Sequence, residues 1–195
     1  MEITANQIKE LRQITGVSMQ ACKNALAEAD GNIEKAVENL RKRGEAKATE
    51  KSSRTTNQGV VESYIHSNKK IGAMVEVLCE TDFVARNEDY VAFAKDVAMH
   101  ITAMNPAVLS PEEISEELIA KEKEIWKELL KNEGKPENIW DNIIAGKEKK
   151  FREESALLKQ KFVKDPDITI EKLLLDLTNK LGENIKISKF ARFEI

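Results

Sequence analysis

The side chains that could catalyse a reaction in this sequence are few, and none lies in a motif that would activate it. His66 and His100 are the only imidazoles, and no serine or cysteine motif for nucleophilic catalysis surrounds either one. We expect His66 at the end of a strand and His100 near the end of a helix, as surface or capping residues. Cys22 and Cys79 form no CxxC pair, and we expect both to pack as small apolar groups.

Motifs that hold a nucleotide or a metal ion are absent from the sequence. There is no GxxxxGK[ST] loop, no GxGxxG after an expected strand, and no metal-ligand spacing of His, Cys, Asp and Glu. An active site built from scattered carboxylates remains an alternative, but no pattern of residues favours it. We therefore expect no cofactor, no metal and no catalytic residue, and the sequence indicates a binding protein.

The stretch that most invites a function is Thr81-Asp-Phe-Val-Ala-Arg86, which joins an expected strand to a helical pattern. In a local interpretation, Thr81 caps a helix, Asp82 lies at the positive end of its dipole, and Phe83 or Val84 turns into the core. In the alternative, the strand-to-helix corner holds Phe83 outward as an apolar wedge for a partner's cleft, with a carboxylate beside it. The residue pattern by itself favours the local interpretation.

Composition limits the classes of protein that this chain can represent. The 195 residues suffice for one or two domains, and 41% apolar with 33% charged residues is a globular, helix-rich composition. The formal net charge of −3 gives no overall attraction to nucleic acid or anionic membranes. We find no signal peptide and no long apolar run, and we expect a cytoplasmic protein.

Three short helices are expected at the N-terminus. A capping box begins the first helix in the range 4–16, Ser18 can cap the second and Gly31 can end it. Asn32 can cap a third helix that we expect to end at Gly44. Each is too short to be stable alone, so residues 1–44 should form a three-helix module. Residues 41–56 include six basic and two acidic residues and almost nothing to bury, which predicts a flexible basic linker at 45–56. Its charge could touch RNA, but it has no aromatic residue to stack on a base.

The remaining residues, 57–195, predict a core domain of the α+β class. Runs rich in β-branched or alternating apolar residues indicate three strands that form an antiparallel sheet, at 59–66, 71–79 and 185–195. Helical periodicity indicates helices packed with that sheet, at roughly 88–104, 111–132, 136–158 and 169–181.

The stretch 81–86 closely resembles the TDFVA[RK] signature of the bacterial translation elongation factor Ts family. The resemblance runs almost end to end, because further family motifs occur in the right order. They are Leu11–Met19, Cys22–Leu26, Gly134–Ile139, Gly146–Phe151, Phe162–Pro166 and Arg192–Glu194. Several long motifs in order make a specific match, and the match reverses the preference for a buried Phe83.

The resemblance implies a function. Members of this family exchange guanine nucleotide on elongation factor Tu, the GTPase that carries aminoacyl-tRNA to the ribosome. In the family, the Asp and Phe of the signature insert into the GTPase domain of Tu, disturb its magnesium site and speed GDP release. By motif these are Asp82 and Phe83, flanked by Thr81 and Val84. The chain would then perform no chemistry of its own.

The resemblance also implies further contacts. The family's N-terminal module is ubiquitin-associated-like and docks on a helix of the same GTPase domain, with Arg12, Met19 and Lys23 at the matching positions. Val163 is the expected contact in the C-terminal segment. Longer members carry a second copy of the core unit, whereas this chain resembles the short form. We therefore expect a homodimer through residues 57–195, giving two Ts with two Tu. The rival interpretations are a ubiquitin-like or peptide-binding adaptor and an RNA-binding accessory protein.

Overall fold

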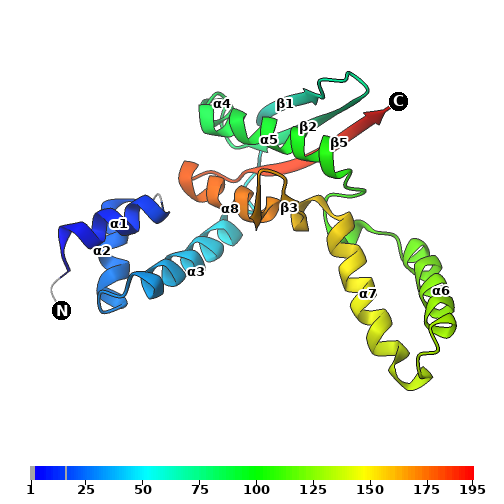
Figure 1. Cartoon of the computed structure of the whole chain (residues 1–195). Helices are drawn as coiled ribbons and strands as arrows, with labels where there is room; N and C mark the ends of the chain where they lie inside the picture. The colour runs from blue at the N-terminus through cyan, green and yellow to red at the C-terminus, as the bar shows by residue number, and fades with distance from the viewer. Residues whose placement is uncertain (1–2, 16) are drawn as a thin grey trace. The chain divides into compact units, whose positions relative to one another are not determined.

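The structure confirms the expected α+β class. The computed structural model describes residues 3–15 and 17–195, leaving aside the side chains of 45–49. Three N-terminal helices are followed by a three-stranded antiparallel sheet with helices (Figure 1). The chain divides into two compact units, each built from three segments. One unit comprises Met1–Val60, Val77–Val91 and Leu174–Lys186, and the other comprises Val61–Glu76, Ala92–Leu173 and Ile187–Ile195.

The N-terminal helices begin where their capping residues predict. These helices are α1 (Ala5–Thr15), α2 (Met19–Glu28) and α3 (Ile33–Lys51). Thr4 and Gln7 form a reciprocal capping box, with N···O distances of 3.3 Å to the Thr4 hydroxyl and 3.0 Å to the Gln7 side chain. The Ser18 hydroxyl accepts from the backbone N–H of Ala21 at 3.3 Å, at the start of α2.

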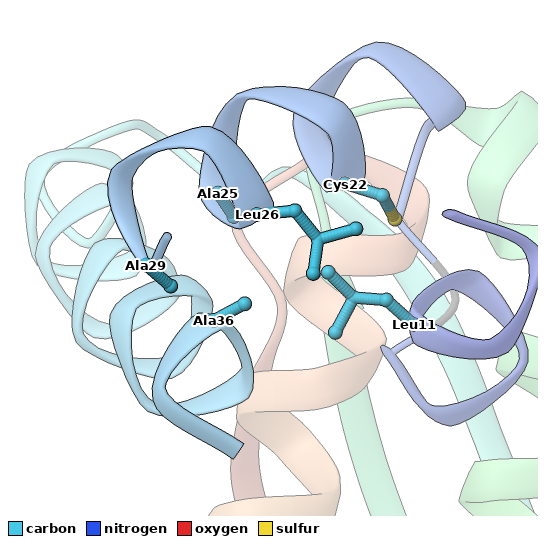
Figure 2. Packing of buried hydrophobic residues seen from close by; sticks show 6 residues of the cluster. All are labelled: Leu11, Cys22, Ala25, Leu26, Ala29 and Ala36. Carbon is cyan, nitrogen blue, oxygen red and sulfur yellow. The ribbon is translucent and has the colours of Figure 1, made fainter. Parts of the chain in front are cut away.

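The three helices share a small hydrophobic core. Figure 2 shows its six buried side chains, which come from α1, from α2 and its C-terminal cap, and from α3: Leu11, Cys22, Ala25, Leu26, Ala29 and Ala36. Four of the six are alanine or cysteine, so the helices approach closely around the two leucines. Cys22 packs there as a small apolar group, as expected.

The predicted end of the third helix at Gly44 is wrong. Helix α3 continues through Gly44 to Lys51, so the first half of the expected linker 45–56 is helical. A single glycine costs a helix only about 1 kcal/mol relative to alanine. The sequence that follows, EAKATEK, consists mainly of good helix formers and offsets this cost. Residues 52–57 then lead without regular structure into the sheet.

The sheet has the strand order β1-β2-β5. Its strands are β1 (Gln58–Ile65), β2 (Ile71–Cys79) and β5 (Lys186–Glu194), close to the expected ranges. The backbone N–H of His66 donates to the Ile71 carbonyl at 2.9 Å and closes the predicted hairpin between the first two strands. Alternate residues of β2 are buried, so one face of this strand packs against the interior: Ala73, Val75, Val77 and Cys79.

Helices α4 (Asp82–Ala85), α5 (Glu88–Met104) and α8 (Ile170–Leu181) follow the expected pattern. The predicted helix 111–132 is interrupted: Pro111–Glu113 forms a 3-10 turn, and Ser115 caps α6 (Glu116–Asn132). The predicted helix 136–158 is α7 (Trp140–Ser155) with a 3-10 turn on either side. Helices α6 and α7 pack as an antiparallel pair around Trp126, Leu130 and Ile144 (Figure 1).

A short antiparallel hairpin precedes α8 and was missed in the sequence. It consists of β3 (Lys161–Phe162) and β4 (Asp165–Thr169), and Val163 lies in its turn. Strand β3 is too short to show alternation, and Pro166 within β4 argues against a strand. The hairpin therefore leaves no local signal that periodicity can detect.

Candidate partner-binding site

Phe83 lies on the surface, at the corner where β2 leads into α4. Thr81 caps α4, its hydroxyl accepting from the backbone N–H of Val84 at 3.4 Å. Ala85 is buried, and Phe83, two residues earlier, is rotated about 200° from it around the helix axis. The Phe83 side chain is 85% exposed. The cap of the local interpretation is thus confirmed. Of its two candidates for the core, Phe83 is exposed and Val84 is half-buried.

The Glu183 carboxylate accepts hydrogen bonds from the two residues that lead into this corner. Its Oε2 accepts from the backbone N–H of Glu80 at 3.1 Å and of Thr81 at 3.0 Å. Its Oε1 accepts from the Thr81 hydroxyl at 2.6 Å. Glu183 lies in the turn between α8 and β5, so a segment more than a hundred residues away fixes the residue that caps α4.

Asn184, the next residue, ties the same corner to the end of the connection after α3. Its backbone N–H donates to Glu80 Oε1 at 2.6 Å. Its side-chain amide donates to the carbonyls of Ser52 at 3.3 Å and Arg54 at 2.8 Å. The Arg54 guanidinium lies 3.4 Å from Glu80 Oε1. The second half of the predicted linker is therefore hydrogen bonded to the corner segment.

Buried groups support the strand behind the corner. The Tyr90 hydroxyl donates to the Val77 carbonyl at 2.6 Å, and burial raises the pKa of this phenol strongly. The Cys79 thiol donates to the Thr81 carbonyl at 3.1 Å, and burial likewise raises the pKa of the thiol. Both groups stay protonated at neutral pH and act as hydrogen-bond donors. Cys79 is a packed residue, as expected from the sequence.

The exposed surface of the corner combines an aromatic ring with a carboxylate. Asp82 Oδ2 lies 3.3 Å from Arg86 Nη2, in an ion pair open to solvent that contributes little to stability. A shallow, open hollow of about 500 Å³ lies beside the ring, lined by Gln58, Glu80, Thr81, Asp82, Phe83 and Arg86. The structure thus places Thr81, Asp82 and Phe83 together on the surface, while Val84 is half-buried.

The other expected contact residues lie on different elements. Arg12 is exposed on the last turn of α1, and Met19 and Lys23 are exposed one turn apart on α2. Residues four apart share a face of a helix, so Met19 and Lys23 present an apolar and a cationic group side by side. Val163 is partly exposed in the turn of the β3–β4 hairpin.

His100 fixes that turn, and its predicted surface position is wrong. The imidazole is fully buried, and its Nδ1 accepts from the backbone N–H of Val163 at 3.2 Å. Because Nδ1 accepts, Nε2 carries the proton and donates to Gln160 Oε1 at 3.0 Å. Burial lowers the pKa of His100, so the neutral form persists. His66 is exposed, as expected.

Known proteins resemble this chain over its whole length. The sequence model of the family described as Elongation factor TS matches residues 1–195. The chain belongs to the elongation factor Ts family. A protein named Elongation factor Ts from Thermosipho melanesiensis is 50% identical over 193 residues, covering 99% of this chain and 98% of its own length. Proteins of the same name from Syntrophus aciditrophicus and Desulfosudis oleivorans are each 50% identical, over 195 and 193 residues. They cover 100% and 99% of this chain, and 97% and 98% of their own lengths.

Two further features describe this elongation factor Ts family member. Within residues 3–15 and 17–195, no group of three or more His, Cys, Asp and Glu side chains is arranged to hold a metal ion. None of the helices in that same part of the chain has the length and apolar character to cross a membrane.

Glu183 and Asn184 lie beside the corner but were not predicted there. They belong to the turn Gly182-Glu-Asn184 after α8, and nothing in the sequence of this turn indicates a contact with Thr81.

Proposed function

We propose that this chain is a cytoplasmic guanine nucleotide exchange factor for elongation factor Tu in translation elongation. It binds Tu with GDP, inserts the corner around Phe83, and promotes GDP release so that GTP can bind. Membership of the elongation factor Ts family supports this proposal. The observation that carries it is the exposed Phe83, held outward by a capped and hydrogen-bonded corner.

The corner offers two physical means of weakening a bound nucleotide. Phe83 enters between elements of the GTPase domain as an apolar wedge, and buried aromatic anchors of this kind dominate interface energies. Asp82 brings a negative charge toward the magnesium ion that neutralises the phosphates of GDP. Thr81 and Val84 flank the pair and set its direction. A magnesium ion with a competing carboxylate binds the phosphates less tightly, and GDP leaves faster.

Exchange of this kind needs no nucleotide site and no chemistry on this chain, so the protein acts as an exchange factor and not as an enzyme. The factor must bind nucleotide-free Tu better than nucleotide-bound Tu, and linkage then makes the two ligands antagonistic. A coupling free energy of roughly 4–5 kcal/mol, expressed mainly in the off-rate, raises GDP release by about three to four decades.

Affinity comes from contacts away from the corner. Arg12, Met19 and Lys23 dock the three-helix module on the GTPase domain, where the apolar Met19 contributes buried area and the two cations contribute steering. Val163 adds a contact from the tip of the β3–β4 hairpin. Docking at these points holds the corner at high effective concentration beside the nucleotide site.

We also propose a homodimer through the core domain, giving a 2:2 complex with Tu. Ile65 and Phe193 are both 68% exposed, and Val61 and Met74 are exposed as well. In the hairpin, Ile65 lies beside Gly72: a Cβ added to this glycine would lie 3.3 Å from Ile65 Cγ1. Ile65, Val61 and Met74 lie on one face of the sheet. This face is opposite to the one that the buried side chains of β2 occupy.

Contacts of the last strand place Phe193 on that same face. The backbone N–H of Ile195 donates to the Lys70 carbonyl at 3.0 Å, and Lys189 Nζ lies 3.2 Å from Glu76 Oε2. This antiparallel register sets Phe193 next to Gly72, across from Ile65. The apolar side chains therefore surround a position without a side chain, and a second copy of the face can cover them.

Release of a fluorescent GDP analogue from purified Tu tests the proposed function. The wild-type chain should accelerate release at catalytic concentrations and form a complex with Tu on a sizing column. An RNA-binding protein would instead shift RNA and leave the release rate unchanged. A peptide-binding adaptor would bind Tu, if at all, without accelerating release. Either result would contradict the proposal.

A further inference from the structure

Helix α4, which carries Phe83, is too short to fix its own orientation. Helix α4 has four residues, and a single helical turn is not stable in water without outside support. Its orientation must therefore be imposed by neighbouring groups. Glu183 accepts three hydrogen bonds from Glu80 and Thr81, and it is not part of the proposed binding surface.

We propose that Glu183 is a positioning residue for nucleotide exchange: its carboxylate sets the direction of the corner and so keeps Phe83 ready for insertion. The inference rests on the proposed function, because positioning is measured by exchange. Glu183 acts through Thr81, the residue that caps the helix, and is therefore distinct from the residues that meet Tu.

Three donors converge on this one carboxylate, and together they leave the corner little freedom. Two successive backbone N–H groups, of Glu80 and Thr81, share Oε2, while the Thr81 hydroxyl takes Oε1. Backbone donors fix the position of the chain, and the hydroxyl fixes the rotamer of Thr81. Hydrogen bonds to a charged acceptor are about twice as strong as those between neutral groups.

The Thr81 hydroxyl carries this constraint forward into α4. It donates to Glu183 Oε1 and at the same time accepts from the backbone N–H of Val84. The two bonds form a continuous path from the carboxylate through Thr81 to the helix that bears Phe83. A rotation of the Thr81 side chain breaks both bonds, so loss of Glu183 also weakens the cap.

The carboxylate form is required because all three partners are donors. In Glu183→Gln, one oxygen remains an acceptor, but the new NH2 group is itself a donor and cannot accept the remaining bonds. Glu183→Ala leaves all three donors to water. We therefore expect exchange activity to fall in the order wild type, Gln variant, Ala variant.

Positioning has a kinetic signature that simple loss of binding lacks. The docking residues on α1 and α2 are untouched, so the apparent affinity for Tu should change by less than about threefold. The exchange rate at saturating factor should fall about tenfold in Glu183→Ala, the effect typical of losing hydrogen bonds to a charged group at a partly exposed site.

The test combines saturating exchange rates with amide hydrogen exchange of the factor alone, read by mass spectrometry over residues 80–85. The series is wild type, Phe83→Ala, Glu183→Gln, Glu183→Ala and the matched control Glu171→Ala. Glu171 is a glutamate of α8 that forms an exposed ion pair with Lys159. We expect faster amide exchange over 80–85 and slower GDP release in both Glu183 variants, and neither change in the control.

Two results would overturn the inference. One is an unchanged saturating rate in Glu183→Ala although its 80–85 amides exchange faster. The other is a reduced rate with unchanged amides, which would mean that Glu183 contacts Tu directly. If Glu183→Ala fails to fold, Glu183→Gln and Thr81→Val carry the test: both should slow release, and the double variant should be no slower than the more affected single one. A wild-type chain that does not accelerate release refutes the proposed function instead.

Discussion

Replacing Phe83 by alanine removes the wedge and leaves the fold in place. Because the ring is 85% exposed, it contributes few contacts to the folded chain. We therefore expect the free energy of unfolding to change by no more than about 0.5 kcal/mol, as for ordinary surface substitutions. Phe93 of α5, which is 7% exposed, is the contrast. Its replacement by alanine should cost about 3–5 kcal/mol of stability, because it empties a core position.

The effect on exchange follows from the exposed area of the ring. Covering a phenylalanine side chain completely gains roughly 1.5–3 kcal/mol. With 85% of Phe83 open in the free chain, about 2 kcal/mol remains to be gained at the partner. If the ring is covered only while GDP is leaving, its loss slows exchange about thirtyfold.

Stopped-flow release of fluorescent GDP from Tu, at rising factor concentration, measures this directly. Phe83→Ala should lower the plateau rate by the stated factor, with circular dichroism and thermal unfolding unchanged. A plateau equal to that of the wild type would refute the wedge. A drop that disappears at high factor concentration would assign Phe83 to docking and not to release.

Three more predictions concern the other parts of the chain. Lys23→Glu should raise the factor concentration needed for half-maximal exchange about tenfold and leave the plateau rate unchanged, since charge reversal at an interface rim alters association; a lowered plateau would contradict the docking role. Stability should fall as the pH drops below 6.5, the ordinary pKa of histidine, because burial lowers the pKa of His100 and the unfolded chain binds a proton that the folded chain does not. The slope should reach at most about 1.4 kcal/mol per pH unit and vanish in His100→Gln, as urea unfolding at several pH values between 7 and 5.5 can show. Phe193→Arg should halve the mass found by light scattering at micromolar concentration, and a wild-type mass equal to one chain would count against the dimer.

Local signals in the sequence predicted most of the elements. Thr4, Ser18 and Asn32 begin helices because their side chains accept backbone N–H groups at those points, and these bonds form in the structure. The hairpin after β1 and the returning strand β5 follow from turn residues and alternation. Such signals depend on neighbours within a few residues, so they survive without knowledge of the rest of the fold.

Features set by distant contacts were not predictable in this way. His100 is buried because Gln160 and Val163, some sixty residues later, supply its hydrogen-bond partners. The exposure of Phe83 could be reached only through the resemblance, since the residue pattern favoured a buried ring. Its support by Glu183 joins segments separated by 102 and 103 positions. A hydrogen bond between residues so far apart in the sequence leaves no periodic pattern from which it could be predicted.

The separation of Glu183 from Thr81 has a consequence during synthesis on the ribosome. The ribosome adds Thr81 well before Glu183. At about 5–20 residues per second, the delay between the two is on the order of ten seconds. Throughout that interval the nascent protein contains Phe83 but lacks the Glu183 carboxylate that is proposed to orient it. If Glu183 positions the corner as proposed, the corner acquires its orientation only after this later residue has been made.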